Sequence, residues 1–351
     1  MKANFKETGS LGAVARNTAA VGLLSFLAWF STVPQVFSSE PVAITLPSGV
    51  TDVQIQQALD ALPKRGGEVV LPPEKISIRQ PVVLRRDNQT LRGSGTATIL
   101  RLADNANCPV LILGEPVNHP KRTVSHLRVA DLFIDGNRRN QQRELWRLAG
   151  EGSQIRNNGI TIQGVSDSMV ENVTCADCRS GGLVTTLGVK RLTVRGLTAF
   201  DNQFDGLACY HTTHSVFSDL YLHDNPGAGI SLDLAFDHNV ISNAVLNAND
   251  LGIFMRASRD NQFHNVTIDN SHRFGVFMAH AEQFIAGVLQ AAPESECTQN
   301  SFTNLIAKNC GRAVFRVNNS SCTNNVIIRP GFDWSMKGGL SQARPDLVTV
   351  Q

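Results

Sequence analysis

Three short segments of the chain place side chains that can do acid–base chemistry at one shared offset. The segments read DGLACYH, AGISLDL and LGIFMRA and span 205–211, 228–234 and 251–257. The fourth residue after the glycine is Tyr210 in the first, Asp233 in the second and Arg256 in the third. Asp205 precedes the first glycine, and His211 follows Tyr210. If the segments stack side by side, a phenol, a carboxylate and a guanidinium lie in one row.

The glycines of these segments belong to a longer repeat. The series is Gly159, Gly182, Gly206, Gly229, Gly252 and Gly275, and each glycine lies 23 or 24 positions after the one before it. Each unit has short apolar–polar alternations separated by Asn and Asp corners, without helical periodicity. The period is too short for a propeller blade. The sequence therefore predicts an all-β, right-handed parallel solenoid with about three strands per coil, stacked at about 4.8 Å.

The elements around the repeat carry a resemblance to a known family. The opening IQQALDALPKRGGEVVLPP, at 55–73, is followed by TLRGSG, at 90–95, and then by the glycine-anchored coils. From about residue 42 to about residue 332, the chain resembles the right-handed parallel β-helix superfamily of pectate lyases and related polysaccharide enzymes. The resemblance implies a single-stranded parallel β-helix and a polysaccharide lyase, epimerase or hydrolase. The fold itself hosts many chemistries.

The predicted domain organisation is one β-helix domain, 40–351, with regular coils at about 159–280. The segment 51–62 reads as an amphipathic helix with a capping box at Thr51 and Gln54, and we expect it to cap the first coil. Its apolar stripe comprises Val53, Ile55, Ala58, Leu59 and Leu62. Insertions are predicted at about 136–158 and 281–297. Past the second one, Ala313 aligns with Gly275, which lies 38 positions before it.

Strand parity assigns a direction to each column of the repeat. The first and third positions after each glycine are apolar or small, so they are expected to face the interior. Cys209 lies in the third column and is interpreted as a core residue rather than a nucleophile. The second and fourth columns are then expected to face outward, which places Tyr210, Asp233 and Arg256 on one outer sheet.

The predicted row suits an acidic polysaccharide. Proton removal beside a uronate carboxylate, in β-elimination or C5 epimerisation, needs neutralisation of that carboxylate, a base and an acid. Arg256 could clamp the carboxylate, Tyr210 and His211 could exchange protons, and Asp233 could hold Arg256 or tune Tyr210. As further substrate-binding residues we predict His214, His280, Arg138, Arg139 and Trp146, the last three within the first insertion.

Two subfamily motifs are absent from the row. The mannuronan C5-epimerases carry Asp-Pro-His on the equivalent strand, where this chain has Ala208 and Tyr210 at the Asp and His positions. Polygalacturonase-like hydrolases share the Asp205–Gly206 pair but have paired aspartates on the next coil, where this chain has Ala228 and Gly229. Two alternatives stay open: a glycoside hydrolase that uses Asp205 and Asp233, with room for water between them, and a non-catalytic glycan-binding or structural solenoid.

The N-terminal segment, 1–39, reads as a secretory signal. Basic residues precede an apolar run at 19–30, and small residues follow it. An uncleaved anchor is the alternative, although the run is short for a membrane span. We expect a secreted, periplasmic or cell-surface protein that does not insert stably into a membrane once the signal is cleaved.

Charge and cysteines narrow the choice of partners. The formal net charge is +2, and loss of the signal would bring it to zero, so nucleic acid is not an expected partner. The seven cysteines include one CxxC, Cys175 to Cys178, interpreted as a buried pair or local bridge rather than zinc ligands. In an exported chain Cys297 or Cys310 could pair with Cys322. The Asp and Asn corners are calcium-type ligands, but no dense carboxylate cluster requires the ion, so no cofactor is expected.

Overall fold

The computed structural model describes residues 42–142, 155–285, 288–291, 295–332 and 348–351. Residues 41–351 form one compact unit, which contains the fold described below. The predicted signal, 1–39, lies outside the described residues. Within the described part, no helix is long and apolar enough to cross a membrane.

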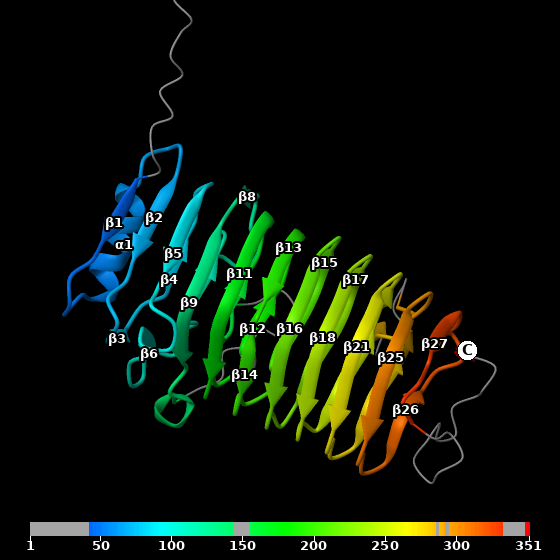
Figure 1. Cartoon of the computed structure of the whole chain (residues 1–351). Coiled ribbons are helices and arrows are strands. Elements are labelled where there is room, and N and C mark those ends of the chain that lie inside the picture. Colours follow the sequence, from blue (N-terminus) through cyan, green and yellow to red (C-terminus); the bar gives the residue numbers. More distant parts are fainter. Residues whose placement is uncertain (1–41, 143–154, 286–287, 292–294, 333–347) are drawn as a thin grey trace, which may run out of the picture. The chain divides into compact units, whose positions relative to one another are not determined.

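The regular secondary structure of the described chain is almost entirely β-strand, as predicted (Figure 1). The first strands, with the one α-helix of the described residues, are β1 (Ala43–Thr45), α1 (Asp52–Ala61), β2 (Gly67–Val70), β3 (Lys75–Ile78), β4 (Val82–Leu84), β5 (Gln89–Arg92), β6 (Ile99–Leu102), β7 (Leu111–Leu113), β8 (Val124–Ser125) and β9 (Arg128–Asp135). A short 3-10 helix, η1 (Arg138–Asn140), follows β9.

The remaining strands form the regular coils and the C-terminal end. They are β10 (Ile160–Ile162), β11 (Val165–Ala176), β12 (Leu183–Thr185), β13 (Val189–Arg195), β14 (Thr198–Phe200), β15 (Leu207–Thr213), β16 (Val216–His223), β17 (Ala228–Asp237), β18 (Val240–Asn247), β19 (Leu251–Arg256), β20 (Ser258–Arg259), β21 (Gln262–Asp269), β22 (Phe274–Ala279), β23 (Glu282–Ile285), β24 (Val288–Ala291), β25 (Ser301–Lys308), β26 (Ala313–Val317), β27 (Asn325–Ile328) and β28 (Val348–Val350).

The strands wind into a right-handed parallel β-helix. Apart from β23 and β24, the strands pair in parallel with strands of the neighbouring coils, and β12, β15, β17, β19 and β22 form one face. The register places Leu183, Leu207, Ile230, Ile253 and Val276 directly beside one another, as the glycine repeat predicted. These side chains are fully buried. Bends at left-handed residues such as Asn243 turn the longer strands around the corners.

Helix α1 lies where the sequence predicted a cap. The side chain of Thr51 accepts a hydrogen bond from the backbone of Gln54, and the Gln54 side chain accepts one from the Thr51 backbone, which completes the capping box. Ile55, Ala58 and Leu59 are buried against the coil below. The prediction for Val53 was wrong, because its side chain is 55% exposed. The apolar face is narrower than expected, since it meets only the end of the solenoid.

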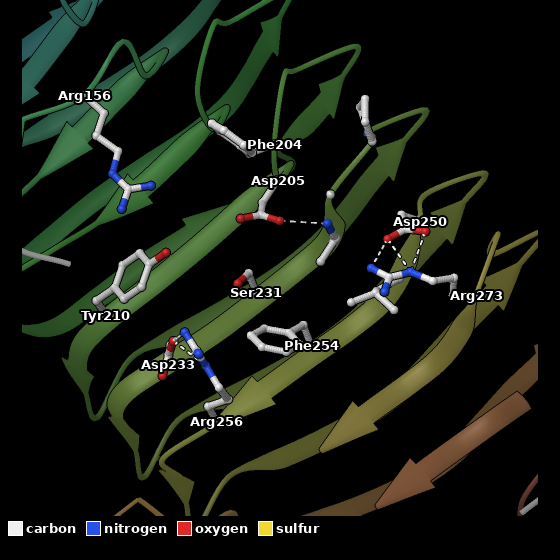
Figure 2. Close-up of a pocket in the computed structure, with 14 residues that line it drawn as sticks. Arg156, Phe204, Asp205, Tyr210, Ser231, Asp233, Asp250, Phe254, Arg256 and Arg273 are labelled. Carbon is white, nitrogen blue, oxygen red and sulfur yellow. Dashed lines mark hydrogen bonds and ion pairs between the residues drawn. The ribbon is translucent and has the colours of Figure 1, made fainter. Parts of the chain in front are cut away.

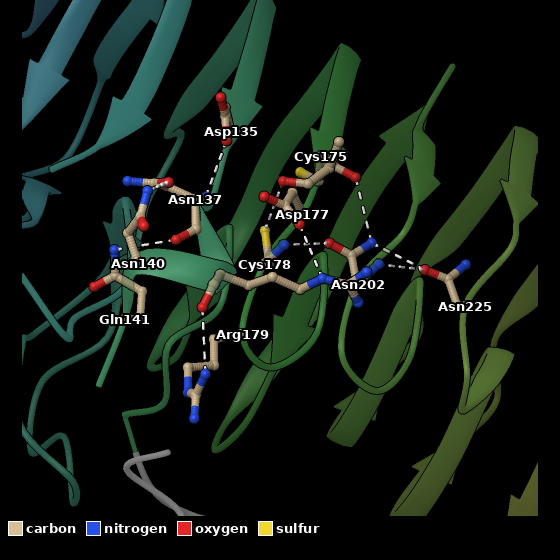
Figure 3. A network of polar contacts seen from close by, with 12 residues as sticks. Asp135, Asn137, Asn140, Gln141, Cys175, Asp177, Cys178, Arg179, Asn202 and Asn225 are labelled. Carbon is tan, nitrogen blue, oxygen red and sulfur yellow. Dashed lines mark hydrogen bonds and ion pairs between the residues drawn. The ribbon is translucent and has the colours of Figure 1, made fainter. Parts of the chain in front are cut away.

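Asparagine side chains connect the coils inside two of the corners. The Nδ2 of Asn202 donates to Oδ1 of Asn225 at 3.0 Å (Figure 3). Asn225 repeats this contact with Asn249 at 2.9 Å. A second ladder comprises Asn239, Asn261, Asn300 and Asn325. Cys178 occupies the ladder position before Asn202 and donates its backbone N–H to that residue at 3.1 Å. Both cysteines of the CxxC are therefore buried, as part of the core and its corner.

The second insertion contains an antiparallel hairpin, β23–β24, between two regular coils. The alignment of Ala313 with Gly275 was wrong by one residue, because Ala313 pairs with Phe274 and Phe315 pairs with Val276. The predicted register would have placed Arg316 in the apolar interior column. A slip of one residue exchanges the two faces of a strand, so the core selects the observed register.

The last two coils bring Cys297 and Cys322 together. β25 pairs with β27 so that Ser301 lies beside Val326, and the same offset along the chain separates the two cysteines. Both are fully buried, and the Nδ2 of Asn325 donates to the Cys297 carbonyl at 3.0 Å. The Cys297 thiol lowers the pKa of Cys322 through a hydrogen bond. Cys310, the other predicted partner, lies at a different corner, where its thiol donates to the Lys308 carbonyl.

We expect Cys297 and Cys322 to form a disulfide when the chain folds in an oxidising compartment. Neighbouring strands are about 4.8 Å apart, within the range of Cα separations that a disulfide spans. Peptide mass mapping of the full chain, purified without reductant and alkylated at denaturation, should find these two cysteines linked and the other five alkylated. Alkylation of both Cys297 and Cys322 in an exported sample would contradict the prediction.

Candidate functional site

A groove crosses the outer surface of the face that β15, β17, β19 and β22 form. Its volume is about 470 Å³, and four predicted residues, Asp205, Tyr210, Asp233 and Arg256, line it. Figure 2 shows their side chains pointing into the same space from three successive coils. The groove thus brings together four predicted residues that are as many as 51 positions apart in the sequence.

The predicted row of Tyr210, Asp233 and Arg256 exists. Tyr210 pairs directly with Asp233 across β15 and β17. The Nε of Arg256 donates to Oδ2 of Asp233 at 2.8 Å, and a second guanidinium nitrogen donates to the same oxygen. Oδ1 of Asp233 accepts the N–H of Leu234 at 2.8 Å. Of the two roles predicted for Asp233, holding Arg256 is the one that the geometry supports.

Asp233 faces outward, as predicted, but it is almost completely covered. It lies on the outer side of its strand but is only 2% exposed, because Arg256 covers it. Gln163 and Thr186, in the same column, are also buried, and their side chains bond to each other. Over these coils, polar contacts between neighbouring side chains of the outward column shield these side chains from solvent. Arg256 itself stacks over the ring of Phe254, with Cζ 5.2 Å from the ring centre.

Asp205 lies at the opposite end of the groove from this ion pair. Its Oδ1 accepts the N–H of Ala228, on the next coil, at 2.7 Å. Its surroundings desolvate the carboxyl group and raise its pKa to about 6, although the Ala228 N–H and Arg156 oppose the shift. The side chain is only partly exposed, yet it lines the groove and can reach a ligand there. Asp205 is therefore an accessible carboxyl group that keeps its proton up to a weakly acidic pH.

Gly227 makes room for Asp205. A Cβ atom at Gly227 would lie 2.5 Å from Oδ1 of Asp205 and 2.7 Å from the backbone of Phe204. The glycine allows the carboxyl group to cross to the next coil and bond to Ala228. Polygalacturonase-like hydrolases have paired aspartates where this chain has Ala228 and Gly229. In this chain the small residues of the segment leave room for a single acid, Asp205.

The sequence prediction missed several groove residues. Phe204, Gly227, Asp250 and Arg273 line the groove from one column, two residues before the glycines of their coils. Arg273 donates through Nε to both oxygens of Asp250, at 2.9 and 2.8 Å. The repeat could have revealed this column, because aligning the glycines also aligns the residues two positions before them. Arg156, near the end of the first insertion, had no such signal.

The histidines of the prediction do not line the groove. His211 adopts a left-handed conformation after Tyr210, and burial lowers the pKa of its imidazole. The ring of His214 packs against His238 at 5.2 Å. The backbone N–H of His280 donates to Asn319 Oδ1 at 3.1 Å, and its ring contacts the same side chain. The chain turns a corner after Tyr210, so positions beyond the fourth column leave the face.

The arginines of the first insertion that were predicted to bind substrate also lie outside the groove lining, unlike Arg156 of the same insertion. Arg138 and Arg139 belong to η1, and Arg138 forms an ion pair with Asp177 at 2.9 Å. Trp146 lies outside the described residues. Among the residues that are described, no three His, Cys, Asp or Glu side chains gather in a way that could hold a metal ion.

Comparison with known proteins identifies similarity to one family and to several solved structures. A family model described as "Periplasmic copper-binding protein (NosD)" matches residues 131–328. A search of curated proteins finds no match.

Three solved structures share the fold at low identity. The family 28 exopolygalacturonase of Yersinia enterocolitica has a TM-score of 0.60 and 12% identity, over 89% of this chain and 78% of that one. The endo-xylogalacturonan hydrolase of Aspergillus tubingensis has a TM-score of 0.55 and 14% identity, over 88% and 99%. ORF18 of Geobacillus virus E2 also has a TM-score of 0.55 and 14% identity, over 82% of this chain but only 61% of its own length. At these identities the likeness concerns the parallel β-helix alone.

Proposed function

The chain belongs to the NosD family, and we propose that it is an exported protein that cleaves an acidic polysaccharide by β-elimination in the groove around Asp205 and Tyr210. The observation that carries the proposal is the composition of the groove. It combines a carboxyl group with a raised pKa, a phenol and three arginines, Arg156, Arg256 and Arg273. The periplasmic description of the family supports export.

The arginines supply the charge that an acidic sugar needs. β-Elimination withdraws the proton from C5, next to the carboxylate, and a cation that neutralises this carboxylate stabilises the charge that develops. Arg156 approaches the groove beside Asp205 and Tyr210 (Figure 2). Arg256 is held by Asp233 and by the ring of Phe254, so its guanidinium is fixed in direction before a ligand arrives.

Tyr210 and Asp205, which both face the groove, carry out the proton transfers. Tyr210, in its phenolate form, accepts the C5 proton, and the electron pair of the C5–H bond forms the C4–C5 double bond. The bond from C4 to the glycosidic oxygen breaks, and protonated Asp205 donates its proton to that oxygen. The cycle closes when solvent returns a proton to Asp205 and removes one from Tyr210. C5 epimerisation shares the first step but does not use a proton donor to the leaving oxygen.

The geometry favours elimination over hydrolysis by Asp205 and Asp233. An inverting hydrolase needs one carboxylate to activate a water molecule. Both oxygens of Asp233 accept hydrogen bonds, from Leu234 and from Arg256, and the side chain is almost completely covered. Asp233 is thus arranged to hold Arg256 rather than to act as a base.

Copper does not enter this proposal. The family description names copper, and copper sites in proteins use groups of His, Cys and Met side chains. In the part of the chain that the structure describes, no three His, Cys, Asp or Glu side chains converge. The donor set of the described residues does not fit such a site, so no step is derived through the metal.

Incubation with uronate polymers tests the proposed reaction. The full chain should release products with unsaturated ends that absorb in the near ultraviolet from polygalacturonate or alginate, and none from a neutral glucan. Reducing ends without unsaturation would replace the proposal with hydrolysis. Binding without any product would replace it with a non-catalytic glycan-binding role.

A further inference from the structure

The groove continues over the next coils as a surface of aromatic rings. Phe254, on β19, pairs with Phe277, on β22, and their rings stack with centres 5.9 Å apart and an angle of 9°. Phe277 also contacts Phe274 at 5.3 Å. Phe254 and Phe277 are both partly exposed on the outer side of the face. An aromatic row therefore leads out of the groove toward the C-terminal coils.

Arginines flank this row on the following coil. Phe277 pairs with Arg316, and the N–H of Arg312 donates to the Arg273 carbonyl at 2.7 Å, which places Arg312 next to Arg273. The guanidinium carbons of Arg312 and Arg316 lie 6.0 and 5.8 Å from the ring centre of Phe274. These cation–π contacts hold both side chains close to the aromatic surface.

The charge of this surface is not compensated within the described residues. Arg273 is paired with Asp250, but neither Arg312 nor Arg316 forms an ion pair with any described carboxylate. Arg316 instead donates to Oδ1 of Asn318 at 3.2 Å, and Arg312 is exposed. The surface therefore has two surplus positive charges beside a hydrophobic row.

We propose that this aromatic–arginine platform, made of Phe254, Phe277, Arg273, Arg312 and Arg316, binds the continuation of a polyanionic glycan chain beyond the groove. The proposal deepens the proposed function and rests on the groove being a glycan site. The apolar faces of sugar rings stack on aromatic rings, and arginines bind carboxylate or sulfate groups in bidentate fashion. Each coil advances the path by about 4.8 Å, so the platform accommodates more than one sugar unit beyond the site of cleavage.

The platform predicts that affinity depends on the length of the ligand. A short oligouronate fills the groove and does not reach Arg312, whereas a long one contacts Arg312, Arg316 and Phe277. We expect Arg312→Ala combined with Arg316→Ala to weaken binding of long oligouronates by about tenfold or more, since it removes two charge-assisted contacts. Binding of short oligouronates should change little.

Isothermal titration calorimetry with the full chain tests this expectation. The titrations use oligouronates of graded length and the Asp205→Asn background, which is expected to slow cleavage by about 10²- to 10⁴-fold during the measurement. Arg122→Ala, which removes an arginine whose side chain is 71% exposed away from the groove lining, serves as the matched control and should not alter either affinity. Arg312→Lys with Arg316→Lys keeps the charge and should recover part of the loss. Thermal unfolding verifies that each variant is folded.

The outcomes separate the platform from the reaction. Equal losses for short and long ligands, or no loss for either, would overturn the platform. Equal affinity for a long neutral glucan would also overturn it, because stacking alone would then explain the binding. Length-dependent binding that is lost in the platform variants, together with an absence of cleavage by the unmodified chain, would keep the platform and overturn the proposed elimination.

Discussion

Replacement of Asp205 by asparagine is expected to lower the rate of polyuronate cleavage by about 10²- to 10⁴-fold, the usual contribution of a general acid. Asparagine keeps the shape of the side chain and an oxygen that can accept the N–H of Ala228, but it has no acidic proton for the leaving oxygen. Affinity for a long oligouronate should stay within a few-fold. The measurement is the initial rate of formation of unsaturated ends, with binding followed separately by calorimetry.

The dependence of the cleavage rate on pH should identify Asp205 as the proton donor. Burial raises the pKa of Asp205 to about 6, and a proton donor acts only while it holds its proton. The proposed step needs the phenolate of Tyr210 together with protonated Asp205, so the rise of the rate with pH should level off at about 6, where Asp205 ionises. This break should be absent from the residual activity of Asp205→Asn. A break that persists unchanged in the variant would assign the titration to another group.

Stability provides the control for the same substitution. A carboxyl group whose pKa is raised by folding makes the folded state less stable as pH rises from the ordinary value of 3.8 to about 6, and the loss is complete above that pH. Asp205→Asn should not lower the melting temperature at alkaline pH, which separates loss of chemistry from loss of fold. Asp219→Asn, on an exposed corner, is the matched substitution and should leave the rate unchanged.

Much of this architecture could be predicted because the repeat carries physical constraints. The glycine spacing fixed which residues neighbour each other across coils, and parity separated the interior column of Leu207, Ile230 and Ile253 from the opposite side of each strand. The pairing of Tyr210 with Asp233 followed from these two rules alone. The prediction was accurate where the coil length did not change.

Errors arose where the period was broken or where side chains reorganised the surface. The insertion before β25 breaks the repeat, so the glycine spacing does not give the register of Ala313. The register follows instead from the exclusion of Arg316 from the apolar core. The covering of Asp233 by Arg256 depends on side-chain contacts that a residue's column does not encode. His211 does not line the groove because the chain bends directly after Tyr210, and the sequence does not mark the position of this bend within β15.

The second large expected effect is a loss of stability when the asparagine ladder inside the coils is interrupted. Asn225 is fully buried and donates through Nδ2 to the carbonyls of Ala199 and His223, at 3.1 and 3.0 Å, besides its contact with Asn249. Its Oδ1 accepts from the backbone and the side chain of Asn202. Asn225→Ala removes all of these contacts and leaves several buried polar groups without partners, each at a cost of about 1–3 kcal/mol. We expect a loss of about 3 kcal/mol or more in the free energy of unfolding.

Chemical denaturation of the variant and the unmodified chain measures this loss, and limited proteolysis locates it. Because each coil contacts only its neighbours, cleavage should begin at the corners beside Asn225 before the ends of the solenoid open. Asn247→Ala is the matched control on the same coils. Its side chain accepts from Asn270 at the surface, so its effect should stay within about 0.5 kcal/mol. Equal stability of the two variants would show that the ladder contributes no more than an exposed contact, and that main-chain pairing and the apolar core hold the coils in register without it.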